Sequence, residues 1–257
     1  MTAVIKSERR GSIALLTISN PPANVWTLQS LDSLRDTVRE LNADPRVRAL
    51  VLTGEGSKFF SAGADLKVFA EGGKLAGANM ARAFGEAFET LAAFRGVSIA
   101  AINGFAMGGG LEAALACDIR IAEAHAQMAL PEGAVGLLPA AGGTQWLAHA
   151  VGEGWAKRMI LCGERVDAAT ALRIGLVEEV VETGKALETA LVLAAKAPKQ
   201  SPGSVEACKR LVHAARGPAQ TALPLERELF LKLFDTADQA EGVNAFLQKR
   251  APEWRHG

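Results

Sequence analysis

Apolar positions along the first third of the chain predict a strand, a helix and a second strand. Residues 12–19 (SIALLTIS) form an apolar run that an Asn-Pro-Pro turn ends, which is typical of a strand. After Thr27, a candidate N-cap, leucine or valine recurs every three or four residues up to Leu41, as on one face of an amphipathic helix. Residues 48–53 (RALVLT) indicate a short buried strand. This order favours an α/β fold.

The middle of the chain continues in the same manner. Residues 97–102 predict an apolar strand, and a helix over 111–117 begins directly after three consecutive glycines. Residues 118–122 (DIRIA) alternate like a strand, and a short apolar run over 127–130 precedes a proline. Further helices are predicted over 143–151, 154–161, 167–173 and 185–197.

The last sixty residues show no strand pattern. Helices are predicted over 205–215 and 221–249, the second broken near Gly242. Residues 197–203 (APKQSPG) are the best linker candidate. We therefore expect an α/β body over residues 1–197 and a helical region over 198–257.

Composition and charge narrow the class of protein. A chain of 257 residues corresponds to about one to two domains of roughly 150 residues. It has 28 Lys and Arg against 28 Asp and Glu, so no broad basic field favours nucleic acid or an anionic membrane. Tyrosine is absent and aromatic residues make up 5%, so the core must be mainly aliphatic and alanine-based.

Several kinds of site and segment have no pattern in this sequence. No secretory signal or membrane span is visible, so we expect a cytoplasmic protein. The odd number and wide spacing of Cys117, Cys162 and Cys208 predict buried free thiols in a reducing compartment. The four histidines have no metal-binding spacing, and dinucleotide, phosphate-loop and GxSxG motifs are missing. We expect no metal site.

Two glycine-containing turns follow predicted strands. They lie in residues 59–67 (FFSAGADLK) and 104–110 (GFAMGGG), and the second opens a helix. Backbone N–H groups at such turns and at helix starts are unpaired and favour negative charge. One amide from each turn could polarise a carbonyl oxygen as an oxyanion hole. The alternative is that both are only tight turns that need left-handed backbone.

Two carboxylates stand in otherwise apolar surroundings. Glu112 lies in a run of small apolar residues just after the glycines, and Glu132 is the only charge in residues 128–138. In one apolar pocket they would form an acid/base pair with raised pKa values. The alternatives are a solvent-facing Glu in a first helical turn and an exposed loop carboxylate. Sequence spacing does not show whether the two side chains meet.

Together these features resemble the crotonase superfamily, also called the enoyl-CoA hydratase/isomerase family. The resemblance covers nearly the whole chain and is carried by residues 20–24 (NPPAN), 61–67, 103–122, 130–147 and 163–181. It implies a spiral of ββα units with a helical C-terminal region that builds trimers, usually paired into hexamers.

The resemblance also implies a reaction. The N–H groups of Ala64 and Gly109 fall on the oxyanion-hole positions, where the thioester carbonyl of an acyl-CoA would sit. Glu112 and Glu132 fall on the positions that flank a single water in hydratases. We therefore expect an enoyl-CoA hydratase that makes 3-hydroxyacyl-CoA and needs no cofactor. The alternatives are a Δ3,Δ2-enoyl-CoA isomerase or related enolate enzyme, and a catalytically weak acyl-CoA or RNA binder.

Contacts to CoA follow from the same resemblance. The loop over residues 62–67 would lie against the adenine and pantetheine end of CoA, and a C-terminal Phe-x-x-Lys step would reach phosphates across subunits. The candidate substrate-binding residues are Ala62, Asp65, Leu66, Lys67, Ala140, Phe246 and Lys249. For both lysines the alternative is an ordinary solvated side chain. Phe69, Phe84 and Phe88 border an acyl tunnel or, as we favour, belong to the core.

Two positions depart from the family pattern. Many relatives have Gly where this chain has Ala140, whose N–H helps hold the catalytic water, and an added methyl could narrow the water pocket. Relatives often carry Arg where this chain has Trp146, a change that the sequence does not explain. Both departures leave room for an unusual acyl substrate.

Overall fold

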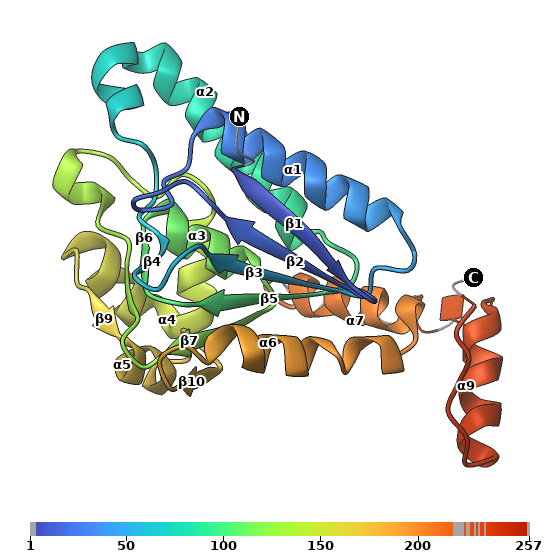
Figure 1. Cartoon of the computed structure of the whole chain (residues 1–257). Helices are drawn as coiled ribbons and strands as arrows, with labels where there is room; N and C mark the ends of the chain where they lie inside the picture. Colours follow the sequence, from blue (N-terminus) through green and yellow to red (C-terminus); the bar gives the residue numbers. More distant parts are fainter. Residues whose placement is uncertain are drawn as a thin grey trace.

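The strands form two sheets whose order follows a repeated path of the chain. The computed structural model describes residues 4–217, 224, 227, 228, 230, 232, 233 and 235–255 (Figure 1). Within these residues a six-stranded sheet has the order β1 (Ile5–Arg10), β2 (Ile13–Ile18), β3 (Ala49–Gly54), β5 (Val97–Ile102), β7 (Ile119–Glu123) and β10 (Glu179–Val181). A four-stranded sheet has the order β4 (Phe59–Ser61), β6 (Phe105–Met107), β8 (Gln127–Ala129) and β9 (Val166–Asp167).

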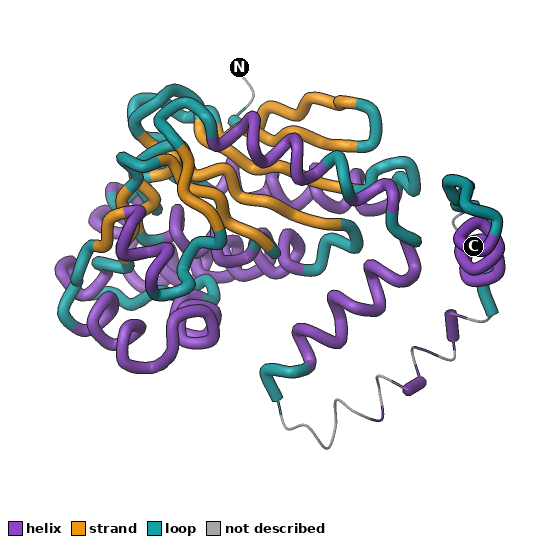
Figure 2. The backbone as a smooth tube through the Cα atoms, turned by 90° about the horizontal axis from the view of Figure 1, so that it is seen from below, coloured by secondary structure: helices purple, strands orange, loops and turns teal. Residues whose placement is uncertain are grey.

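Helices connect and cover these strands. The described helices are α1 (Leu28–Ala43), α2 (Lys67–Ala92), α3 (Gly109–Ala116), α4 (Gly143–Leu161), α5 (Ala168–Arg173), α6 (Ala186–Ala194), α7 (Pro202–Ala214) and α9 (Ala237–Leu247). Two short 3₁₀ helices are η1 (Glu132–Val135) and η2 (Ala197–Lys199). Figures 1 and 2 show α9 lying apart from the rest of the described body.

The chain repeats a ββα unit, as expected. In β3-β4-α2, β5-β6-α3 and β7-β8-α4, the first strand belongs to the large sheet and the second to the small sheet. The strands β4, β6 and β8 are parallel neighbours, so the three loops that follow them leave the same edge. Loops at the carboxyl ends of parallel strands commonly build binding sites. The expected α/β spiral is confirmed.

Alternation along the central strands divides the core between two faces of the large sheet. Ile13 and Leu15 of β2 pack with α6, whereas Leu16 belongs to the main core on the other face. Helix α6 turns Ala186, Ala190 and Ala194 towards the sheet, spaced four residues apart on one face. Small side chains let the helix lie close to the strands, which is consistent with an alanine-based core. Figure 1 shows α6 along one face and α1 and α2 across the other.

Several elements differ from the sequence predictions. No strand was expected at β1, whose residues after Ile5 are exposed and mostly charged because it is the antiparallel edge of the sheet. Helix α2 was also missed, since glycines interrupt its apolar pattern and its backbone is non-helical at Gly73. The predicted break near Gly242 is wrong: α9 continues through it, and the absent side chain makes room for the ring of Trp254.

The cysteine prediction is partly wrong. All three thiols are free, but only Cys117 is buried. Cys162 is exposed because it follows the last residue of α4, and Cys208 lies on an exposed position of α7.

Candidate active site

The candidate site lies where the loops after β4, β6 and β8 meet. The loops after β4 and β8 carry Ala64 and Glu132, and α3, which begins directly after the loop that follows β6, carries Gly109 and Glu112. All four line one cavity of about 330 Å³. The structure therefore brings together the four residues that the sequence singled out but could not place relative to one another.

The loop after β4 presents the amide of Ala64. Trp26 N–H donates to Gly63 O at 2.8 Å, and Asp65 N–H donates to Trp26 O at 3.0 Å. These two bonds fix the backbone on either side of Ala64. Among the described residues its own N–H has no acceptor, although it lines the cavity. Such a fixed and unpaired amide can donate a hydrogen bond to an oxygen atom of a ligand.

The second amide comes from the start of α3. Gly108 has φ of 51° and precedes the helix, whose first-turn N–H groups lack intrahelical acceptors. A Cβ built on Gly63 would lie 3.3 Å from Gly109 N, so the two glycine turns are in direct contact. A Cβ on Gly109 would lie 2.8 Å from a ring carbon of Phe84. A side chain at this position would therefore collide with Phe84.

Glu112 is buried within α3, which excludes the solvent-facing alternative. Only 3% of the residue is exposed. Its Oε1 accepts hydrogen bonds from Ala141 N–H at 2.8 Å and Gly143 N–H at 2.9 Å. Burial raises the pKa of Glu112, and the two amides oppose that rise because they stabilise the charged form. The carboxylate is thus held in one orientation by two backbone donors.

Glu132 opens η1 and faces the same cavity. Its Oε2 is buried and has no hydrogen-bond partner in the described structure. Burial raises the pKa of Glu132 to about 7, and the nearby Glu112 charge adds to the rise. A Cβ on Gly108 would lie 2.9 Å from Glu132 Oε1, so the carboxyl group lies against the glycine turn. A carboxyl that is protonated near neutral pH can act as an acid.

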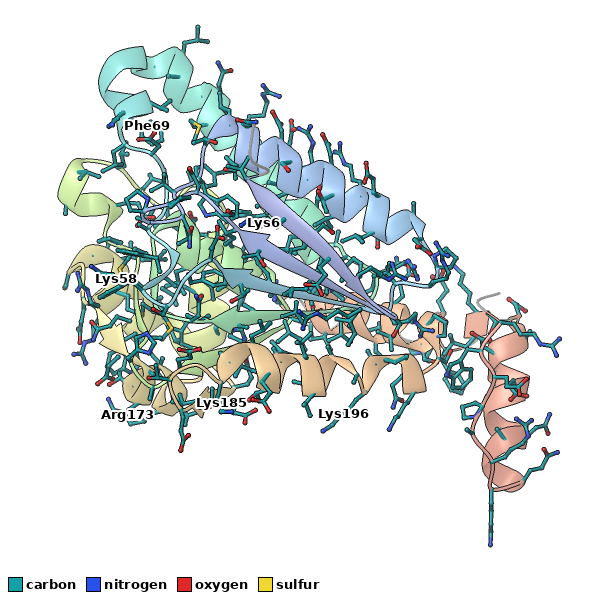
Figure 3. All side chains as sticks on the ribbon, in the orientation of Figure 1. Lys6, Lys58, Phe69, Arg173, Lys185 and Lys196 are labelled. Carbon is teal, nitrogen blue, oxygen red and sulfur yellow. The ribbon has the colours of Figure 1, made fainter. Side chains whose placement is uncertain are left out.

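The remaining wall of the cavity is apolar. Its lining side chains other than the two carboxylates include Leu66, Phe69, Phe84, Met107, Val135, Leu137 and Leu138. Phe69, labelled in Figure 3, lies in the first turn of α2. We favoured a core role for three phenylalanines, and this holds for Phe88, which is fully buried beside Trp26. Phe84 also belongs to the buried core and in addition borders the cavity, as does the partly buried Phe69.

The candidate CoA contacts divide into two groups. Ala62, Leu66 and Ala140 line the cavity. Asp65 accepts a hydrogen bond from Lys67 N–H at 3.1 Å at the start of α2, and the side chain of Lys67 is exposed.

The two C-terminal candidates for CoA contacts are Phe246 and Lys249. Lys249 is exposed just after α9, with φ of 54°. The side chain of Phe246 lies outside the described part of the structure. The CoA-binding roles of both residues stay predictions.

Sequence reasoning missed the residues that support the carboxylates. Glu112 is held by the amides of Ala141 and Gly143, whereas the sequence directed attention to the amide of Ala140. A backbone N–H donor cannot be recognised from the residue type, so the neighbouring glycines were the only feature of the sequence that indicated these donors. The ring of Trp146, which the sequence did not explain, packs against Gly142: a Cβ built on Gly142 would lie 2.6 Å from two of its ring carbons.

Two further features concern the described part of the chain. None of its helices is long and apolar enough to span a membrane. Its His, Cys, Asp and Glu side chains form no group of three or more that could hold a metal ion.

Comparisons with known proteins identify the family of this chain and several similar proteins. The profile of the family described as Enoyl-CoA hydratase/isomerase matches residues 8–257. The chain is 38% identical to the Short-chain-enoyl-CoA hydratase of Clostridium acetobutylicum, covering 96% of this chain and 95% of that protein. It is 40% identical to the 2,3-dehydroadipyl-CoA hydratase of Escherichia coli, covering 96% of each. The solved structure of Pseudomonas aeruginosa DspI is similar with a TM-score of 0.96 and 64% identity, covering 99% of this chain and 97% of that one.

Proposed function

Because the chain belongs to the enoyl-CoA hydratase/isomerase family, we propose that it is an enoyl-CoA hydratase that adds water across the C2=C3 bond of a 2-enoyl-CoA. The observation that carries the proposal is that two unpaired amides and two carboxylates meet in one apolar cavity. The amides suit a thioester oxygen, and the carboxylates suit a water and a transferred proton. Hydratase names among the relatives agree with this assignment.

The thioester carbonyl is proposed to accept hydrogen bonds from the N–H groups of Ala64 and Gly109. As water attacks C3, negative charge moves through C2 onto this oxygen, and the fixed amides stabilise it. One donor of this kind typically contributes about 2.7–4 kcal/mol to transition-state stabilisation. The apolar wall strengthens the effect by keeping bulk water away from the charge.

The two carboxyl groups are proposed to have different tasks. Two amides stabilise the ionised form of Glu112, so it can orient the water and accept its proton as hydroxide adds to C3. Glu132 has a buried oxygen without a partner and a pKa of about 7, so its protonated form can give a proton to C2. The product is a 3-hydroxyacyl-CoA, and one turnover leaves a proton on Glu112 that must return to Glu132.

The acyl chain of the substrate is proposed to be aliphatic. Gly77, Ala81 and Phe84 line the cavity from one face of α2, and Phe84 lies against Gly109. Gly77 precedes Phe84 by seven residues, which is about 10 Å along a helix. A Cβ on Gly77 would meet no atom within 4 Å, so the path along α2 is open there. Its length would accommodate a chain longer than crotonyl.

Hydration of purified enoyl-CoA thioesters tests the proposal directly. Loss of conjugated-enoyl absorbance is expected with crotonyl-CoA and with longer chains, and no loss at any length would overturn it. Glu112→Gln and Glu132→Gln should each lower kcat by about 10²–10⁴-fold, the usual contribution of a positioned acid or base. Binding of the product CoA ester should persist in both variants. Glu153→Gln, an exposed carboxylate on α4, is the matched control.

A further inference from the structure

The turn that holds Glu112 is packed between two side chains. On one side, a Cβ built on Gly143 would lie 2.8 Å from Glu112 Oε1. On the other, a Cβ built on Gly142 would lie 2.6 Å from two ring carbons of Trp146 and 2.8 Å from a third. Carbon contacts are optimal at about 3.5–4.0 Å, so neither glycine has room for a side chain. The backbone of this turn is therefore in direct contact with both the carboxylate and the indole.

The indole contacts the turn where its backbone is left-handed. Gly142 has φ of 96°, in the left-handed region, and no side chain caps the start of α4. The N–H of Trp146 donates to Gly142 O at 2.8 Å, so one residue contacts the turn through both its backbone and its ring. Trp146 also packs against the main core, which gives the ring a fixed support.

We propose that Trp146 is a positioning residue for Glu112. Its ring holds residues 141–143 against the carboxylate, so that both amide donors stay within hydrogen-bond distance of Oε1. The inference rests on the proposed role of Glu112 in hydration. Trp146 itself does not line the cavity that holds the two carboxylates. Trp146 would therefore act on Glu112 through the backbone of the turn.

Removal of the ring has a specific electrostatic consequence. Without its support the turn can move away, and the two amides then stabilise the charged form of Glu112 less. The buried carboxylate would ionise at a higher pH. Among the described side chains, Glu132 lines the same cavity as Glu112, and the charge of Glu112 contributes to the raised pKa of Glu132. The acidic limb of the profile of kcat against pH should therefore move to higher pH.

Trp146→Ala tests the inference, with Trp146→Phe as the conservative variant. For Ala, kcat should fall about 10- to 100-fold with KM nearly unchanged, because small misplacements of catalytic groups have effects of this size. The acidic limb of kcat against pH should shift upward. Phe keeps a ring against Gly142 and should restore most of kcat and the original limb. Gln145→Ala, an exposed neighbour on α4, is the control and should change neither.

A second variant disturbs the same turn from the backbone side. Gly142→Ala keeps the indole but places a methyl group where the ring lies, so it should reproduce the loss of kcat and the shifted limb. Circular dichroism and thermal melts establish that each variant is folded. Unchanged kcat in folded Trp146→Ala, or a loss with an unmoved acidic limb, would overturn the inference. If Glu112→Gln is also fully active, the proposed function itself is wrong.

Discussion

At the scale of single residues, the site depends on carboxyl groups kept in an unfavourable environment. Glu112 is buried with two amide donors, whereas Glu132 has a buried oxygen with none. Burial raises the pKa of both groups, and the two amides oppose this rise for Glu112. Acid/base addition of water, as proposed above, needs one carboxyl group that accepts a proton and one that gives a proton.

The environment of Glu132 predicts that this carboxyl group lowers the stability of the protein while serving the proposed activity. Its pKa rises from 4.5 to about 7 on folding, so the folded protein binds the proton more tightly and loses stability as pH rises through that window. Glu132→Gln removes this loss. We expect it to stabilise the protein by about 1–2 kcal/mol at pH 8, after allowance for partial solvent exposure, and by little below pH 4.5.

Urea unfolding at pH 4.5 and pH 8 measures this difference. The control is Glu153→Gln, whose carboxylate is exposed and pairs with Lys157 in the next turn of α4. It should not stabilise the protein at either pH. An equal gain for Glu132→Gln at both pH values would show that burial of its charge is not the cause.

At the scale of elements, α2 supplies the wall along which the acyl chain is proposed to run. Small residues at Gly77 and Ala81 follow one another on the face that ends at Phe84. A larger side chain at Gly77 would enter open space and not the protein interior. A substitution at Gly77 should therefore change the length of acyl chain that the cavity accepts without disturbing the fold.

Gly77→Leu should shorten the range of accepted substrates. Turnover of crotonyl-CoA is expected to remain, while kcat/KM for enoyl-CoAs of about eight carbons or more falls at least about tenfold, since the leucine blocks apolar surface that the longer chain would bury. The comparison is Ala78→Leu, which adds the same side chain at an exposed position of α2 outside the cavity. Equal losses for short and long substrates would argue against the proposed path.

At the scale of the whole molecule, α7 ties the helical region to the α/β body. Lys209 Nζ donates to Phe94 O at 2.6 Å, to Gly96 O at 3.3 Å and to Asp118 Oδ2 at 2.9 Å. Its side chain is 12% exposed. Residues on both sides of the expected boundary at 197 are thus in contact. The division into two regions and the assembly into trimers or hexamers stay predictions.

Lys209→Met should therefore lower the free energy of unfolding of the whole chain. The substitution removes three hydrogen bonds at a mostly buried site, at a cost of about 2–3 kcal/mol, while Asp118 Oδ2 keeps the hydrogen bonds that the N–H and the hydroxyl of Ser98 donate to it. Lys157→Met breaks an exposed pair on α4 and should cost less than about 0.5 kcal/mol. The urea midpoints of both variants test this prediction, and similar midpoints for the two variants would contradict it.

Local patterns were sufficient to predict many elements. The strand at 97–102 was predicted with its observed bounds, and the helix after Thr27 begins at Leu28 with the predicted cap. Elements that lack a continuous pattern were missed, such as β1 with its exposed charges and α2 with its glycines. Strand β1 is fixed by pairing with β2, and α2 packs against α1, so both elements depend on contacts that their own local patterns do not contain.

The sequence by itself determined which groups are available: two glycine turns, two carboxylates among apolar residues, and no net charge. Those follow from residue type and local backbone preference. Only the tertiary structure decided that they meet, because three parallel strands bring separate loops to one edge of a sheet. It also decided that Glu112 is held by backbone amides and that Trp146 supports their turn. Almost every residue has a backbone N–H group, so only the fold determines which of these groups point towards Glu112.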